Sequence, residues 1–183
     1  MKKILMLISD GFEEIEALGT VDILRRCGIE VSLVSVTGSF EIHSSRNIKV
    51  IADNKLEEIN VDSSLWDAVI LPGGQPNADN LRDNDKVVET VKDFYKAGKL
   101  TCAICAAPIV FEKAGIIRDK KVTSYPGCLV NESDCIFTAK SVEQDGNIIT
   151  ANGPASACDF AFEIAKALGL SHKAENVRKG MLF

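Results

Sequence analysis

Short, mostly apolar runs alternate with longer segments of helical periodicity along most of this chain, and no other feature constrains its fold as strongly. The runs are Lys2–Ile8, Glu30–Val36, Asp67–Leu71 and Leu100–Ile104. Strands that are apolar on both faces are typical of a parallel sheet covered by helices on both sides. We therefore expect an α/β fold with a largely parallel sheet. The segments Phe40–His43 and Ile48–Ala52 predict a small antiparallel excursion from it.

The segments between these runs have apolar residues at helical spacing and stop at glycines. The first expected helix has Ala17, Val21 and Leu24 on its inner face and ends before Gly28. Two more are expected over Asn84–Ala97, before Gly98, and over Ala106–Ala114, before Gly115. The last begins at Pro154, and its inner face consists of Ala157, Ala161, Ile164 and Leu168. Asp145-Gly146 indicates a hairpin over Ser141–Thr150, and we expect Glu175–Phe183 to pack as a short tail. Since no linker or repeat interrupts the pattern, residues 1–183 are expected to form one domain.

Composition excludes several classes of protein. Apolar residues make up 46% of the chain, which is too high a share for a disordered protein. A net charge of −5, without any Lys/Arg run longer than two residues, argues against a nucleic-acid partner. The apolar stretch Ala103–Phe111 is too short to span a membrane, and Ile4–Ile8 is too short for a signal peptide. We therefore expect a cytoplasmic protein whose six cysteines are free thiols.

Cys105 is the best candidate for a catalytic nucleophile. Ligands of parallel sheets bind at the carboxyl ends of the strands, which selects Ser9–Glu16, Leu71–Asn77 and Ile104–Pro108. Cys105 lies where an apolar strand meets a helix, an elbow that exposes the side chain, and the helix N-terminus favours a thiolate. Cys102 falls inside the strand, so we interpret it as a core residue rather than as a redox partner.

The other two strand ends offer groups that complement a cysteine nucleophile. Gly73 and Gly74 allow a close backbone approach, so an N–H there and the N–H of Ala106 are candidates for an oxyanion hole. The first helical turn carries three carboxyl groups, those of Glu13, Glu14 and Glu16. A carboxyl beside a thiolate resists ionisation and can act as a proton shuttle, but position alone does not choose among the three.

Histidine, metal and cofactor chemistry are not expected. Neither His43 nor His172 lies at a predicted strand end, so a Cys–His pair is not indicated. Cys128 and Cys135 lack the spacing of zinc ligands, and we expect no metal site. The chain contains neither a phosphate-binding loop motif nor a dinucleotide-binding glycine motif, so we expect no nucleotide cofactor.

Four motifs, in order along the chain, resemble the ThiJ/PfpI superfamily, and the match is nearest the branch of the Parkinson-disease protein deglycase. They are Asp10–Glu16 (DGFEEIE), Leu71–Gly74 (LPGG), Ala103–Ala106 (AICA) and Asn152–Pro154 (NGP). The resemblance covers essentially the whole chain. It implies a flavodoxin-like sandwich, a homodimer and cofactor-free chemistry.

The resemblance also implies roles for individual residues. Cys105 takes the place of the nucleophile, and Glu16 takes that of a protonated glutamate that hydrogen-bonds it. Gly74 and Ala106 would supply the oxyanion N–H groups. Gly73 would lie beside them in the substrate-binding loop.

Two positions outside these motifs are also informative. Arg46 matches an arginine that lies near the subunit interface in relatives. Tyr125, before Pro126, stands where some members carry a histidine near the nucleophile. A phenol is a poor base at neutral pH, so Glu16 would have to carry the proton transfers.

The activities attributed to this family are glyoxalase conversion of methylglyoxal to lactate and deglycation of early adducts. We therefore predict a cofactor-independent cysteine enzyme that acts on reactive 2-oxoaldehydes or on their early glycation adducts. An alternative from a different class is an oxidative-stress sensor that works through oxidation of Cys105 with little turnover. A cysteine amidohydrolase or peptidase is disfavoured because it requires a histidine partner.

Overall fold

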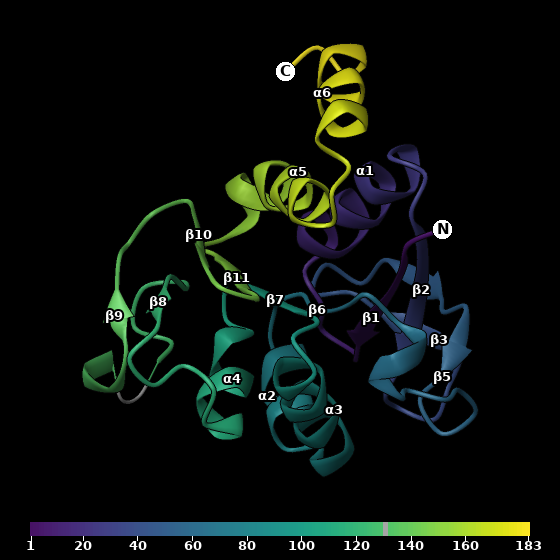
Figure 1. Ribbon diagram of the computed structural model, residues 1–183. Coiled ribbons are helices and arrows are strands. Elements are labelled where there is room, and N and C mark those ends of the chain that lie inside the picture. The colour runs from purple at the N-terminus through teal and green to yellow at the C-terminus, as the bar shows by residue number, and fades with distance from the viewer. Residues whose placement is uncertain (130–131) are drawn as a thin grey trace.

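A seven-stranded sheet forms the centre of the computed structural model, which describes residues 1–129 and 132–183 (Figure 1). In spatial order the strands are β10 (Val142–Asp145), β11 (Ile148–Ala151), β7 (Leu100–Ile104), β6 (Ala68–Leu71), β1 (Lys3–Ile8), β2 (Glu30–Ser35) and β5 (Asn54–Lys55). All neighbouring pairs are parallel except β10 with β11. The strands β2, β1, β6, β7 and β11 have the order 2-1-3-4-5 of flavodoxin-like folds, as expected.

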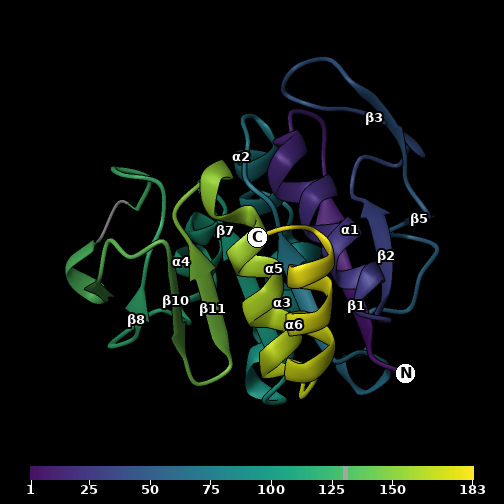
Figure 2. The same cartoon turned by 90° about the horizontal axis from the view of Figure 1, so that it is seen from above.

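Helices cover both faces of this sheet (Figure 2). One face packs against α1 (Thr20–Arg26) and α5 (Ala157–Ala167), and α6 (Ser171–Gly180) lies outside α5. The other face packs against α2 (Asn77–Arg82), α3 (Asp85–Lys96) and α4 (Pro108–Ala114). Alternate residues of β1 enter the two cores, Ile4 and Met6 on one side and Leu5 and Leu7 on the other. The buried, two-sided strands predicted from sequence are therefore confirmed.

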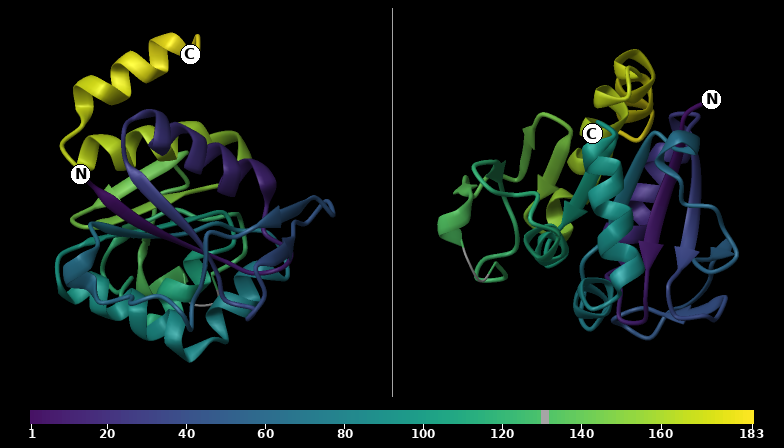
Figure 3. Two further views of the ribbon diagram at one scale, coloured as in Figure 1. Left: turned by 90° about the vertical axis from the view of Figure 1, so that its right-hand side faces the viewer. Right: turned by 60° about the horizontal axis from the view of Figure 1, so that its bottom comes forward.

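Smaller elements lie outside the main sheet (Figure 3). β3 (Glu41–His43) and β4 (Lys49–Ile51) form the predicted antiparallel hairpin, and β8 (Lys121–Val122) pairs with β9 (Ile136–Phe137) in parallel. Three short 3₁₀ segments, at Ser63–Leu65, Glu132–Asp134 and Pro154–Ser156, connect larger elements. The described helices are all too short or too polar to cross a bilayer.

Two helices differ from the sequence-based expectation. Most of the segment predicted as a C-terminal tail belongs to α6, a largely polar helix that buries only Ala174 and partly buries Val177. Such a thin apolar stripe is a weak helical signal. The six residues of α2 were not predicted either, because Ala78 and Leu81 alone mark its inner face.

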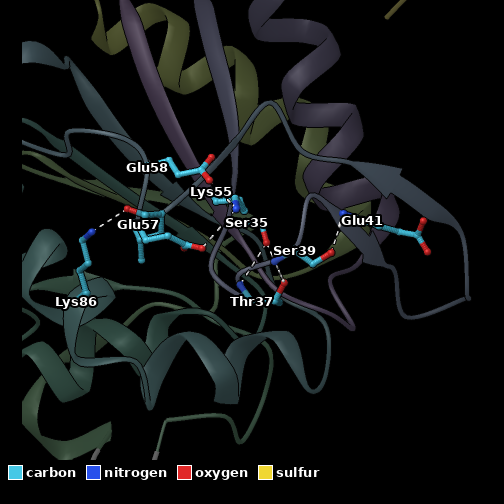
Figure 4. Close-up of polar contacts among 9 residues, drawn as sticks. Ser35, Thr37, Ser39, Glu41, Lys55, Glu57, Glu58 and Lys86 are labelled. Carbon is cyan, nitrogen blue, oxygen red and sulfur yellow. Dashed lines mark hydrogen bonds and ion pairs between the residues drawn. The ribbon is translucent and has the colours of Figure 1, made fainter.

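A row of hydroxyl groups organises the chain where β2 ends (Figure 4). This hydroxyl ladder consists of Ser35, Thr37 and Ser39. The Ser35 hydroxyl accepts the Thr37 N–H at 3.2 Å, the Thr37 hydroxyl accepts the Ser39 N–H at 3.2 Å, and the Ser39 hydroxyl accepts the N–H of Glu41 at 3.1 Å. Beside it, Lys55 pairs with Glu58 at 2.6 Å. These local bonds give the backbone N–H groups of Thr37, Ser39 and Glu41 an acceptor between β2 and β3.

Candidate active site

Cys105 occupies a sharp elbow between β7 and α4. Its φ angle is +62°, a left-handed conformation that non-glycine residues rarely adopt. Two backbone hydrogen bonds, each 2.8 Å long, hold it there: its N–H donates to the Ala151 carbonyl, and its carbonyl accepts the Tyr125 N–H. The elbow leaves the Cys105 side chain half-buried at the carboxyl edge of the sheet, as the sequence predicted.

Glu16 faces this elbow from the segment that follows β1. It lies in a π-helical turn, Ile15–Gly19, that precedes α1, and its side chain is fully buried. Glu16 Oε2 accepts the Gly73 N–H at 2.8 Å. Glu16 Oε1 is buried without a regular hydrogen bond among the described residues, and the Cys105 thiol is the donor close enough to influence this carboxyl. π-Helical turns are rare and occur often at functional sites.

Gly73 lies where the segments that follow β1, β6 and β7 come together. A Cβ atom built on Gly73 would lie 2.7 Å from Glu16 Oε2, 2.8 Å from Cys105 Cβ and 3.0 Å from the Ala106 nitrogen. All three distances are shorter than van der Waals contact, so only glycine fits here. The carboxyl, the thiol-bearing residue and a backbone donor thus surround a single backbone position.

Burial controls the ionisation of both side chains. Burial raises the pKa of Glu16 to about 7, a shift that its hydrogen bonds with Cys105 and Gly73 oppose. Burial also raises the pKa of the Cys105 thiol, and the charge of the Glu16 carboxylate raises it further. Burial of Cys105 therefore opposes the preference for a thiolate that the sequence predicts from the helix N-terminus, while the Ala106 N–H acts in the predicted direction and lowers the thiol pKa.

The loop after β6 packs against the loop after β1 with no room for side chains between them. A Cβ atom on Gly74 would lie 2.3 Å from the Gly11 carbonyl oxygen, and one on Gly11 would lie 2.2 Å from Pro76 Cδ. Both glycines have positive φ angles. Asn77, which is buried, joins the same loops: its amide donates to the Pro72 and Gly73 carbonyls, and its oxygen accepts the Ser9 N–H at 2.6 Å.

The backbone N–H groups of Ala106, Gly73 and Gly74 differ in what they contact. The Ala106 N–H interacts with the Cys105 sulfur and lowers its pKa. The Gly74 N–H meets no acceptor in the described part of the chain, whereas the Gly73 N–H is occupied by Glu16. Of the two predicted loop glycines, Gly74 therefore keeps a backbone donor without an acceptor among the described residues, whereas that of Gly73 is used by Glu16.

Comparisons with known proteins show the family to which the chain belongs. Residues 2–167 match the model of the DJ-1/PfpI family. The chain belongs to this family. It is 35% identical to protein dj-1beta of Drosophila melanogaster over 99% of this chain and 97% of that protein, and 32% identical to the Parkinson disease protein 7 homolog of Danio rerio over the same shares.

Solved structures of family members share the fold. The crystal structure of Drosophila melanogaster DJ-1beta superposes with a TM-score of 0.92 at 36% identity, covering 99% of this chain and 97% of that one. An oxidized Toxoplasma gondii DJ-1 superposes with a TM-score of 0.92 at 30% identity, covering 100% and 99%. The resemblance inferred from the four motifs is confirmed.

The three acidic residues of the family motif have different environments. Glu13 Oε2 accepts the Glu16 N–H at 2.8 Å. Glu14 accepts the hydroxyls of Ser44 and Ser45 and, at 2.7 Å, the Arg46 N–H. Burial alone would raise the pKa of Glu14, but these hydrogen bonds outweigh it and the pKa is lowered. Of the three side chains, Glu16 alone is fully buried, and burial raises its pKa to about 7.

Arg46 and Tyr125, the two positions outside the family motifs, differ in their contacts with the Cys105 elbow. Arg46 is exposed in the turn between β3 and β4, and its guanidinium donates to the Ser45 carbonyl at 3.3 Å. The Tyr125 ring is 53% exposed, so the contact of this residue with Cys105 is made by its backbone. Tyr125 Cδ2 would lie 3.8 Å from a Cβ on Gly153, which places the Asn152–Pro154 motif beside it.

The remaining candidate ligands and bases lie elsewhere. His43 contacts Glu41 at 3.7 Å and His172 contacts Asn176, and both histidines are exposed. An amidohydrolase with a Cys–His pair is therefore not supported. Cys102 is fully buried in the core, as expected. Within residues 1–129 and 132–183, no group of three or more His, Cys, Asp or Glu side chains is arranged to hold a metal ion.

Two residues near the elbow escaped the sequence reasoning. Asn77 follows a Gly-Gly-Gln-Pro segment, where asparagine commonly bonds to loop backbone, but nothing in the pattern shows that it is buried. Cys128 was considered only as a zinc ligand. A charge on Glu16 raises the pKa of Cys128, and a charge on Cys128 raises that of Cys105, which places both thiols near the same carboxyl.

Proposed function

We propose that this protein is a cofactor-independent enzyme that converts reactive 2-oxoaldehydes, or their early glycation adducts, to 2-hydroxy acids with Cys105 as the nucleophile. The observation that carries the proposal is the coupling of the Cys105 thiol to Glu16, a buried carboxyl whose pKa is about 7. A base is most effective when its pKa is near the working pH. Membership of the DJ-1/PfpI family supports the same chemistry.

The first step is the addition of sulfur to the aldehyde. The Glu16 carboxylate takes the Cys105 proton while the sulfur bonds to the aldehyde carbon, and the carbonyl electron pair moves to the oxygen. The N–H groups of Gly74 and Ala106 stabilise the oxyanion, which then receives the proton from Glu16 to give a hemithioacetal. Because burial raises the pKa of the Cys105 thiol, a base beside the thiol assists its deprotonation.

The second step moves hydrogen between adjacent carbons. Glu16, again ionised, removes the proton from the former aldehyde carbon, and the neighbouring carbonyl oxygen takes up a proton to give an enediol. Glu16 then returns its proton to the neighbouring carbon, while the hydroxyl on the sulfur-bearing carbon loses its proton and becomes the thioester carbonyl. The product is a thioester of a 2-hydroxy acid on Cys105. Water hydrolyses the thioester, releases the hydroxy acid and restores the thiol. No change in oxidation state of the protein is required.

The decisive experiment measures lactate formation from methylglyoxal without glutathione. Wild type should turn over, Cys105→Ala should have no activity, and Glu16→Gln should lose about 10²- to 10⁴-fold. Because the ionised carboxyl is the active form, kcat/KM of wild type should rise with pH through about 7. The rise should be missing in Glu16→Gln. Cys158→Ala, which removes a distant half-buried thiol, is the matched control. Full activity in Cys105→Ala would refute the proposal.

A second candidate function is redox sensing through Cys105. The oxidized Toxoplasma gondii DJ-1 structure favours it. Mild peroxide followed by peptide mass analysis should locate the first oxidation at Cys105. If lactate formation is absent while Cys105 oxidises selectively, this second function replaces the first.

We also propose a homodimer formed through the β3–β4 hairpin. Four exposed apolar side chains lie on this hairpin and the neighbouring turn: Ile15, Phe40, Ile48 and Ile51. Hydrogen bonds of Glu14 with Ser44 and Arg46 hold the two segments together. Light scattering should give the mass of a dimer for wild type and of a monomer for Ile51→Lys. Leu65→Lys, equally exposed outside this surface, should stay dimeric. A monomeric wild type would refute the proposal.

A further inference from the structure

We infer that Cys128 is the resolving cysteine of this site and forms a disulfide with Cys105 after a hydroperoxide oxidises Cys105. The inference rests on the reactivity of Cys105 that the proposed function requires. It adds a second cysteine to the site, and the disulfide is a product of oxidation that thiols can reduce.

Two successive hydrogen bonds bring Cys128 back toward the elbow. The Cys105 carbonyl accepts the Tyr125 N–H at 2.8 Å, and the Tyr125 carbonyl accepts the Cys128 N–H at 3.2 Å. Between them lies a Pro126-Gly127 turn, in which Gly127 has a φ angle of +75°. A turn closed in this way places the Cα atom of Cys128 within about 7 Å of that of Tyr125, whose N–H is bonded to the elbow.

The surroundings of the two thiols are consistent with a reaction between them. Both Cys105 and Cys128 are half-buried, and both sense the charge of Glu16. Tyr125, Pro126 and Gly127 are exposed, so the turn has room to move when the sulfur atoms approach bonding distance. Cys102, in contrast, is fully buried inside β7.

The reaction balances with a hydroperoxide as the oxidant. The Cys105 thiolate attacks the outer oxygen of the hydroperoxide, the O–O bond breaks, and an alcohol leaves with a proton, which yields a sulfenic acid. Cys128 then attacks the Cys105 sulfur, the S–S bond forms, the S–O bond breaks, and hydroxide leaves with a proton as water. Glu16 is placed to supply that proton. The two thiols together lose two electrons.

The test combines mass analysis with recovery of activity. Reduced protein is treated with a small excess of hydrogen peroxide, and free thiols are alkylated before digestion. Wild type should lose two hydrogen atoms and yield a Cys105–Cys128 linked peptide. Cys128→Ser should instead gain two oxygens on Cys105. Dithiothreitol should restore lactate formation in wild type and not in Cys128→Ser, since sulfinic acid is not reduced by thiols.

Cys135→Ser is the matched control, because it removes another half-buried thiol from the same part of the chain. It should behave like wild type. Before oxidation, Cys128→Ser should form lactate at the wild-type rate, which tests the proposed function separately. The inference is overturned if wild type and Cys128→Ser give the same sulfinic acid at the same rate. It is equally overturned if the disulfide maps to Cys102–Cys105 or if Cys105 resists peroxide.

Discussion

The carboxyl edge of the sheet has two polar regions that differ in how deeply their carboxyl groups are buried. At the ends of β1, β6 and β7, the carboxyl of Glu16 is fully buried and one of its oxygens lacks a regular hydrogen bond among the described residues. At the ends of β2 and β5, the hydroxyl ladder is satisfied by neighbouring backbone, and Glu58 is 50% exposed and paired with Lys55. Both regions lie where ligands of parallel sheets bind, yet of the two carboxyl groups compared, only that of Glu16 is fully buried.

The difference teaches that a strand end becomes a reactive site through desolvation. A partly exposed ion pair such as Lys55–Glu58 contributes little to stability, and its hydrogen bond raises the pKa of Lys55, which favours the charged form. A buried carboxyl without a counterion holds its proton until the pH nears neutrality. Three substitutions test this distinction, two in the first region and one in the hydroxyl ladder.

The largest effect is expected from Gly73→Ala. The added methyl group would displace Glu16, Cys105 and the Ala106 N–H together. We expect turnover to fall by at least about a hundredfold, and the free energy of unfolding to fall by about 1–3 kcal/mol. Gly38→Ala is the control at the ladder, where the nearest atom is 3.6 Å away and φ is +80°. It should cost roughly 1 kcal/mol of stability with unchanged turnover. Equal turnover losses in both variants would contradict the comparison.

The next effect concerns the pH dependence of stability. The folded state keeps the Glu16 proton up to about pH 7, whereas the unfolded chain releases it near the ordinary value of 4.5. Wild type therefore loses stability as pH rises between these values, by roughly 3 kcal/mol in all. Glu16→Gln lacks this loss, so denaturant unfolding should show it more stable than wild type at pH 8 and similar at pH 4.5. The same dependence of stability on pH in wild type and in Glu16→Gln would show that burial of Glu16 is not its cause.

The smallest effect is expected from Ser35→Ala. Its buried hydroxyl accepts the Thr37 N–H and contacts the Thr37 hydroxyl at 3.0 Å. Its loss should lower the free energy of unfolding by about 1 kcal/mol, measured by urea titration. Lactate formation should remain at the wild-type level. A substantial loss of turnover would show that the ladder contributes to the reaction.

The sequence predicted the elements whose signals are local. The apolar strand runs and the terminating glycines anticipated most of the sheet and the ends of the longer helices, and the strand–helix junction indicated the Cys105 elbow. Burial of Glu16 was not readable from composition, because three glutamates in a first turn are equally consistent with stabilisation of the helix dipole. Only the family resemblance distinguished Glu16 from its neighbours. The raised thiol pKa also escaped prediction, since desolvation depends on packing between distant segments.

The π-helical turn at Ile15–Gly19 also determines where the chain tolerates insertion and deletion. Such a turn holds one residue more than an α-helical turn, and each residue rotates the next by about 100°. Glu16 near its start faces the thiol, while Val21 and Leu24 beyond it face the core. Deletion of Gly19 would rotate Glu16 relative to Val21 and Leu24, so that either Glu16 faces the thiol or the two apolar residues face the core, but not both. No atom lies within 4 Å of a Cβ atom built on Gly19, so other residues fit at this position, whereas deletion of the residue is not tolerated.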